Sequence, residues 1–446
     1  MTAGLAFYLV DVDVLRPWHG ESDLQVYRGA VAWSVHRPLY SFRLRGTPYG
    51  FSYPPFAAYL MRPLAWLTRT EAMVLNEIAS VLVLVGTTWW LVAPVAARHG
   101  WPVRTAVGVA VPSAYVLEPV RETLGLGQVN LYLAALVLMD VAALRRGSRF
   151  AGLGIGLAAA VKLTPGLFIP YLAITGRWRA AGVATGAFLG AAAVAFALSP
   201  ATSVQFWTRT LFQTSRVGPT GAVANQSILG LLTRLAAPHR PDTALTVVVL
   251  GAVLVVGLTR ARSAHRQGDE IVGCTLTGLT ACLLSPISWT HHLYWIVPAE
   301  LVLADIAAGT AAHVRRRSLA RDRPRLIAAA AAVAATVVFL VFALTVVWYF
   351  ASPAGDMRGH GPVAVLGADA YALVLLGLLV LLPARRAVPR SAGTAGDRRV
   401  ERCGPDDGVR PRRFRRARVH RPTAGAVGTV RPARPGRVGP RCAGAS

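Results

Sequence analysis

Charged residues are scarce in this chain of 446 residues and make up only 15% of it. Soluble domains contain about 25% charged residues, so this scarcity excludes an ordinary water-soluble enzyme. Apolar residues form 54% of the chain and recur in long blocks, and the mean hydropathy is +0.46. We therefore predict an all-α polytopic membrane protein rather than several soluble domains.

Cysteine is also rare, with four residues in the whole chain. Cys274 and Cys282 lie in one apolar stretch, Cys403 and Cys442 lie near the carboxyl end, and none has the spacing of zinc ligands or of a disulfide framework. The Walker A loop and the G-x-S-x-G, H-E-x-x-H and kinase signatures are missing too. The sequence thus disfavours an ATP-driven transporter and a nucleotide-sugar enzyme with a cytosolic domain, and we expect no cofactor and no metal.

Acidic residues are outnumbered, with 21 Asp and Glu against 47 basic residues, for a net charge of +26. Residues 385–446 contain 17 Arg and four acids, so this segment alone contributes +13. Its Arg, Pro and Gly composition cannot form a core. We predict a polytopic membrane body over 1–383 and a disordered cytoplasmic tail over 384–446. Such a tail attracts anionic membrane lipids, and we expect no nucleic-acid partner.

About 20 apolar residues cross a bilayer as a helix. Counting an N-terminal segment, we predict about 12 membrane segments. Two shorter pieces, 150–162 and 164–175, are joined at "KLTP", where Pro165 and Gly166 break the helix, and they predict a re-entering hairpin. The remaining candidates are 72–97, 102–117, 130–144, 180–198, 243–258, 270–284, 293–309, 326–350 and 366–383.

The orientation follows from the arginines, which are enriched in cytoplasmic loops. Clusters such as Arg145/Arg146 and Arg260/Arg262 are placed inside when both termini are cytoplasmic. The out-of-place polar residues then fall on the outer face and predict a cavity open to the extracytoplasmic side. These residues are Asp23, Arg28, Tyr53, Glu118, Arg121, Gln128, Asn130, Lys162, Asn225, Gln226, His291 and His292.

Asp23 closely follows the first predicted span, which holds its carboxylate near the membrane surface. Two explanations stay open. Asp23 is either a solvated loop acid or a general base that removes a proton from an attacking hydroxyl. Glu21 is the rival for the second role, and Arg28 and Tyr53 of the same loop are further candidates for the site.

The segment "EPVRETLGLGQVNLYL" concentrates polar groups between two spans. Glu118, Arg121, Gln128 and Asn130 are either ordinary loop polarity or a binding site for a phosphate or sugar, for which an arginine among hydrogen-bonding side chains is well suited. The sequence gives these two explanations equal weight.

Lys162 is the single lysine of the chain, and the other 46 basic residues are Arg. A charge at membrane depth costs roughly 2.5–3.5 kcal/mol on insertion scales. The side chain either reaches to the outer surface or binds a phosphate as a compact point charge. We favour the phosphate.

His291 and His292 stand at the outer start of a span. Adjacent helical side chains point in different directions, so the pair does not suit one metal ion. Their aromatic neighbours are typical of an interfacial belt, and we expect at least one His to face the cavity and bind a phosphate or a hydroxyl. Asn225 is interpreted as a helix cap in preference to a ligand.

Six of these motifs occur in one order: "DLQVYRGA", "FSYPPFAAYL", "LGLGQVNLYL", "AAAVKLTPGLF", "NQSILGLL" and "SPISWTHHLYW". Together they resemble glycosyltransferase family 87 over roughly residues 5–383. The resemblance implies a GT-C fold with extracytoplasmic loops around the active site, in the plasma membrane. It further implies an inverting transfer of mannose from a β-linked polyprenyl phosphate to give an α-(1→2) linkage.

In that scheme Asp23 matches the acid of the first extracytoplasmic loop and is the base. Lys162, Arg121 and one His of the pair are the candidates for holding the donor phosphate. The acceptors implied are envelope glycolipids, phosphatidylinositol mannosides or lipomannan. A decaprenyl-phospho-arabinose-dependent arabinofuranosyltransferase is the alternative within the family. A secondary transporter or lipid flippase is the alternative of another class, although only one broken hairpin is visible and transporters show matched pairs.

Overall fold

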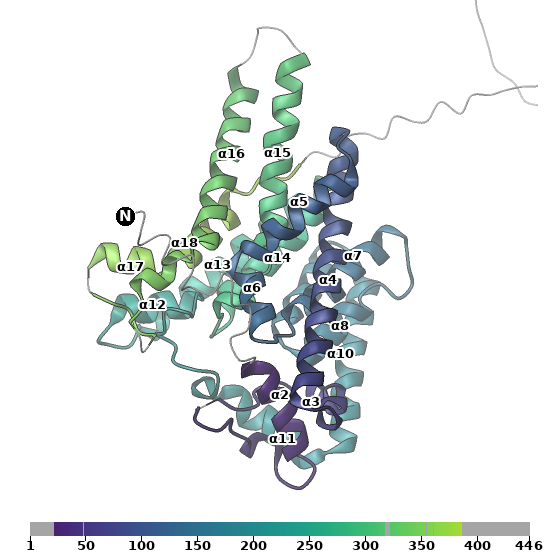
Figure 1. Cartoon of the computed structure of the whole chain (residues 1–446), viewed down its shortest axis with the longest axis vertical. Coiled ribbons are helices and arrows are strands. Elements are labelled where there is room, and N and C mark those ends of the chain that lie inside the picture. Colours follow the sequence, from purple (N-terminus) through teal and green to yellow (C-terminus); the bar gives the residue numbers. More distant parts are fainter. Residues whose placement is uncertain (1–21, 48, 317–321, 353–354, 360, 386–446) are drawn as a thin grey trace, which may run out of the picture. The chain divides into compact units, whose positions relative to one another are not determined.

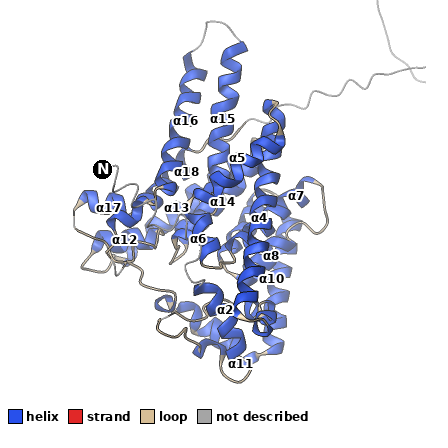
Figure 2. Ribbon diagram, in the orientation of Figure 1, coloured by secondary structure: helices blue, strands red, loops and turns tan. Residues whose placement is uncertain are grey.

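The computed structural model describes residues 22–385, apart from 48, 317–321, 353–354 and 360. Over these residues the chain consists of helices and connecting loops without a strand, as Figure 2 shows. The all-α prediction is confirmed. The predicted first span, Glu21 and nearly all of the predicted tail lie outside the described residues.

Most helices follow one another with short connections, and longer segments join α2 to α3, α11 to α12 and α16 to α17 (Figure 1). Their bounds are α2 (Ser22–Trp33), α3 (Pro55–Leu60), α4 (Arg69–His99), α5 (Val103–Val116), α6 (Glu118–Gly125), α7 (Asn130–Arg145), α8 (Leu153–Val161), α9 (Phe168–Ile174), α10 (Trp178–Leu198), α11 (Pro200–Thr208), α12 (Ile228–Ala236), α13 (Thr243–Arg266), α14 (Glu270–Leu284), α15 (Ile296–Arg316), α16 (Asp322–Ala343), α17 (Pro362–Ala368) and α18 (Ala370–Leu381). Short 3₁₀ turns include η3 (Thr164–Leu167), η6 (Thr290–His292) and η7 (Val346–Phe350).

Polar residues at the helix ends fix where the long apolar segments begin. Thr68 and Glu71 form a reciprocal capping box at the start of α4, and Gly100 ends this helix in the left-handed region at φ 70°. Asp242 and Asp269 accept backbone N–H bonds at the starts of α13 and α14. The caps explain why apolar runs of similar composition become separate helices.

Four described helices are long and apolar enough to cross a membrane: Arg69–His99, Trp178–Leu198, Thr243–Arg266 and Leu326–Ala343. Two bent pairs, α6 with α7 (119°) and α17 with α18 (71°), raise the number to six if each pair is one span. This supports a multi-pass membrane protein, whereas the predicted count of twelve is not confirmed. The segments predicted at 102–117 and 270–284 are helices of 14 and 15 residues, shorter than a full span.

Two predicted spans are interrupted. The segment 326–350 ends its helix at Ala343 and turns at Thr345, whose φ is 50°, before η7. The segment 366–383 is divided at Asp369, which is completely buried and accepts a bond from Arg234. Hydropathy alone did not show either break, because the breaking residues lie within apolar surroundings.

The segment 150–175 is broken, as predicted, but the helix ends at Val161, and Pro165 and Gly166 lie within η3 beyond the break. Helix α8 ends before Lys162, and η3 and α9 continue the chain beyond it. Gly152 lies against Ala180 and Gly156 against Ala184, so α8 runs in the same direction as the first half of α10. Since α8 has nine residues and α10 has 21, Lys162 lies roughly halfway along α10 at the tip of the hairpin.

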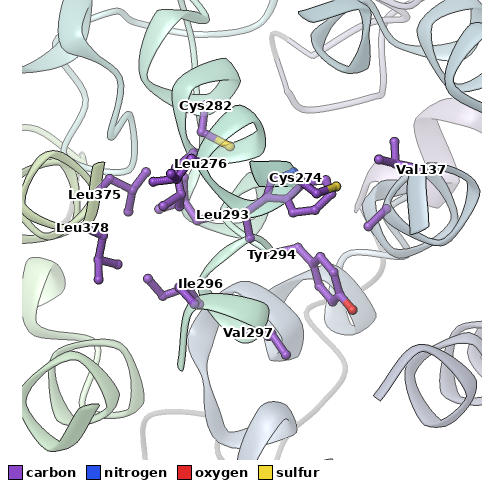
Figure 3. Packing of buried hydrophobic residues seen from close by; sticks show 14 of the residues in the cluster. Val137, Cys274, Leu276, Cys282, Leu293, Tyr294, Ile296, Val297, Leu375 and Leu378 are labelled. Atoms are coloured by element: carbon purple, nitrogen blue, oxygen red, sulfur yellow. The ribbon is translucent and has the colours of Figure 1, made fainter. Parts of the chain in front are cut away.

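Two hydrophobic clusters form the core. The larger one joins α14, α15 and α18, and Figure 3 shows Leu276, Leu293, Ile296 and Leu375 packed together. The second includes Tyr27 and packs the predicted outer loop, with α2 and α3, against α8 and α11. The loop after the first predicted span is therefore a packed unit that gives Asp23 a fixed position.

A cluster of ion pairs joins the helix ends on the side of the helical body away from Asp23. Arg385 donates to both oxygens of Asp269 at 2.8 Å and to Asp305 at 2.9 Å. Arg98 and His99, at the end of α4, also bind Asp305. Arg385 was assigned to the tail, so the packed chain extends two residues beyond the predicted boundary at 383.

Candidate active site

A cavity of about 440 Å³ lies between α2, the tip of the hairpin and the loop 285–292. This volume is in the usual range for sites that bind small ligands. Six residues predicted from the sequence line it: Asp23, Tyr53, Gln128, Lys162, His291 and His292. They come from five separate stretches of the chain, so the fold brings half of the twelve predicted polar residues to one cavity.

Asp23 stands in the first turn of α2 and is half-buried. Its Oδ2 accepts a hydrogen bond of 2.8 Å from Gln128 Nε2, and the Oε1 atom of the same amide accepts one of 3.1 Å from Tyr53. The Tyr27 and Tyr53 hydroxyls are 2.9 Å apart. Burial raises the pKa of Asp23, while the Gln128 bond and the charge of Lys162 act in the opposite direction.

Lys162 is directed into the cavity. Its Nζ donates to Asn130 Oδ1 at 2.9 Å and lies 5.6 Å from the centre of the Tyr53 ring. The Nδ2 atom of Asn130 donates to the His291 carbonyl at 2.9 Å, so this amide is held at both ends. Asn130 therefore stands behind the lysine and orients it. This contact favours the phosphate hypothesis over a side chain that reaches to the outer surface.

The histidines share the cavity wall but have different surroundings. Their rings lie 4.6 Å apart and are nearly perpendicular, at 87°. His292 Nδ1 accepts a bond of 3.2 Å from the Trp289 backbone, whereas the buried Nε2 of His291 has no hydrogen-bond partner among the described residues. His291 lines the cavity, and its Nε2 is a buried polar atom that the described residues leave unpaired. No group of three metal-ligating side chains is present in the part of the chain that the structure describes.

Two predicted arginines do not line the cavity. Arg28 donates to the Leu67 carbonyl at 2.7 Å and ties α2 to the loop before α4. Arg121 is buried and donates to the Val116 carbonyl at 3.1 Å, because the turn of α6 directs it toward the end of α5. The geometry therefore does not support Arg121 as a donor-phosphate ligand, although it is close to Gln128 in sequence.

Glu118 and Asn225 do not line the cavity either, although each is bonded to a residue of its wall. Glu118 is fully buried and accepts bonds from Trp348 Nε1 at 2.6 Å and from the Tyr371 hydroxyl, so it connects α6 to the C-terminal helices. Asn225 is not the cap of α12, since Ser227 has that position. Asn225 donates to the Pro286 carbonyl and accepts from the Ser288 backbone, which joins two loops.

Sequence reasoning missed Arg216. It lies in the loop between α11 and α12, lines the cavity and donates to the Tyr40 carbonyl. It adds a second basic side chain to the site, beside Lys162. Nothing in its spacing distinguishes it from the other arginines, whereas Lys162 was conspicuous by residue type. Trp289 and Trp348 also line the cavity and give it apolar walls.

Comparisons with known proteins agree with the motif resemblance. The sequence profile of glycosyltransferase family 87 matches residues 51–286. A polyprenol-phosphate-mannose-dependent alpha-(1-2)-phosphatidylinositol mannoside mannosyltransferase of Mycobacterium tuberculosis is 35% identical over 63% of this chain and 69% of its own length. Its namesake in Mycolicibacterium smegmatis is 33% identical over 67% and 71%.

A third relative, the alpha-(1-2)-phosphatidylinositol pentamannoside mannosyltransferase of Mycolicibacterium smegmatis, is 30% identical over 63% of this chain and 68% of its own. No solved structure matches the chain. Because the family profile covers more than half of the sequence and these relatives extend the match, the chain belongs to glycosyltransferase family 87.

Proposed function

We propose that this glycosyltransferase moves mannose from a polyprenyl phosphate to a mannose hydroxyl of a phosphatidylinositol mannoside, with Asp23 as the general base. The relatives' names support this donor and acceptor class, and they favour mannose over arabinofuranose. The observation that carries the proposal is the position of Asp23 and Lys162 on one cavity, each oriented by its own amide partner, Gln128 or Asn130.

In the proposed reaction the acceptor hydroxyl attacks the anomeric carbon while Asp23 takes its proton. The bond from that carbon to the phosphate oxygen breaks, and polyprenyl phosphate leaves as an anion. Attack from the face opposite the phosphate inverts a β-linked donor to an α-product. One base suffices because the leaving group needs no proton.

Lys162 supplies the positive charge where the phosphate anion develops. Asn130 holds its ammonium group before the substrate binds, so little reorganisation accompanies the reaction. A charge is more effective in such a partly dry site than in water. His291 Nε2 and Arg216 offer further contacts to phosphate or sugar oxygens.

The proposed location is the plasma membrane, with the cavity on the extracytoplasmic face. Arginines at the far ends of the helices support this orientation, since Arg98, Arg145 and Arg262 all lie at the end of a helix opposite the cavity. Lipomannan is a second acceptor class that the same chemistry accommodates.

The test supplies purified full-length protein with labelled polyprenyl-phospho-mannose and a phosphatidylinositol mannoside, and in parallel with decaprenyl-phospho-arabinose. We expect a labelled glycolipid from the first donor alone, cleaved by an α-mannosidase.

Asp23→Asn should reduce turnover by about 10²- to 10⁴-fold. Glu122→Gln is the matched control, because Glu122 is a second carboxylate on the same cavity, and it should be far milder. Transfer from the arabinose donor, or an active Asp23→Asn enzyme, would contradict the proposal.

A further inference from the structure

A second cavity, of about 500 Å³, lies far from the catalytic one. It is formed where α9 ends, α10 begins and α13 makes its last turns, and its wall includes Trp178, Arg262, His265 and Arg266. Helix α14 starts next to this cavity and ends at the loop of the catalytic cavity, and its 15 residues extend roughly 22 Å. The two cavities therefore lie at opposite ends of the helical body.

The acids next to this cavity are already engaged. Glu270 forms an ion pair with Arg177 and a hydrogen bond of 2.6 Å with His265 Nδ1. Asp269 is held by Arg385. Arg262 and Arg266 have no acidic partner among the described residues, and both are exposed. Two guanidinium groups thus remain for an anion from outside the chain.

The two arginines are placed to bind one group. They are four residues apart on α13, so they lie on the same face of the helix, about 5–6 Å apart at Cβ. Two forked guanidinium donors at this separation match the oxygens of a phosphate.

The same face of α13 continues as an apolar stripe. Val255 and Val248 precede Arg262 by seven and fourteen residues, so they repeat on one side of the helix, and they are 61% and 67% exposed. Helix α13 is one of the four helices long and apolar enough to cross a membrane. Trp178, at the mouth of the cavity, is 72% exposed, and tryptophan prefers the boundary between lipid and water.

We infer that this cavity binds an anionic phospholipid, with its phosphate on Arg262 and Arg266 and an acyl chain along Val255 and Val248. The positive charge of the two arginines favours an anionic headgroup. The adjoining apolar stripe favours a lipid over a free phosphate, because an inorganic anion would make no favourable contact with it. Basic pockets at the ends of membrane helices bind such headgroups.

The test measures equilibrium binding of fluorescent phosphatidylglycerol to the purified full-length protein in a neutral detergent. The double variant Arg262→Gln/Arg266→Gln should bind about tenfold more weakly or worse. The control Arg104→Gln/Arg146→Gln removes two exposed arginines at the same end that line neither cavity, and it should stay within about twofold of the wild type. Unlabelled phosphatidylglycerol should displace the probe, and phosphatidylcholine should not.

Equal losses in both double variants, or no loss in either, would overturn the inference. Displacement by inorganic phosphate as efficient as by phosphatidylglycerol would overturn it in favour of a free-phosphate site. Mannose transfer by the Arg262→Gln/Arg266→Gln enzyme in phosphatidylcholine should be unchanged, which separates this site from the proposed reaction. If the double variant does not fold, the single variant Arg266→Gln, in the last turn of α13, provides the same comparison. It should bind the probe about threefold more weakly.

Discussion

The hypothesis that the site binds the donor phosphate depends on one ammonium group, that of Lys162 at the tip of the hairpin. Lys162→Met keeps the length and removes the charge, so turnover should fall by about 10²-fold or more while the protein stays in the membrane. Lys162→Arg should restore little, because a planar guanidinium does not fit the position that Asn130 fixes. Initial rates with saturating donor measure the turnover of both variants against the wild type. An active Met variant would show that the charge serves another purpose.

Gln128 is a positioning residue, and the pH dependence of the reaction reports on it. Asp23 must be ionised to act as a base, so activity should fall as the pH decreases through its raised pKa. The hydrogen bond from Gln128 lowers that pKa, so Gln128→Leu should move the acid limb of the rate profile to higher pH. A loss of rate without this movement would indicate a structural role alone.

At the scale of elements, the contact between α8 and α10 determines where Lys162 lies. An added Cβ at Gly156 would be 2.3 Å from the Ala184 carbonyl oxygen, which is backbone and cannot give way. Gly156→Ala should therefore destabilise the protein by about 1–3 kcal/mol and reduce turnover through displacement of the hairpin.

Gly186→Ala is the matched control on α10, because nothing lies within 4 Å of its added Cβ. Thermal unfolding in detergent should distinguish the two variants. Similar unfolding temperatures would mean that α8 and α10 separate easily, which would contradict the packing described above.

At the scale of the whole molecule, a buried ion pair joins segments 135 positions apart. Arg234 of α12 binds Asp369, before α18, with Nε 3.0 Å from Oδ1, and both side chains are buried. Arg234→Met leaves a buried carboxylate without its partner and should cost about 3–5 kcal/mol of stability. Arg240→Met removes an exposed arginine and should have almost no effect on the unfolding temperature. Equal stability of the two variants would contradict the burial of the pair.

The sequence predicted the helical membrane class, the broken hairpin and six of the residues that line the cavity. These succeeded because each left a local signal, such as an apolar run, a proline or a solitary lysine. Arg121, Glu118 and Arg28 were misplaced because closeness along the chain does not tell which way a side chain points. Arg216 is held at the cavity by its bond to the Tyr40 carbonyl, 176 positions away, and no local sequence pattern predicts such a contact.

The ion cluster at the far end has a consequence for biosynthesis. Asp269 and Asp305 leave the ribosome long before Arg385, their common partner. Asp305 can already pair with Arg98 and His99, which precede it in the chain. Until the last described helix has been made, however, Asp269 lacks the guanidinium that holds it in the finished protein, and Asp305 lacks its bond to the same group. Closure of this end is thus the final step of assembly, and a chain released before Arg385 should be recognised as incomplete and degraded. Pulse-chase lifetimes of chains ending at Ala384 and at Arg386 would show the difference, with the longer chain stable.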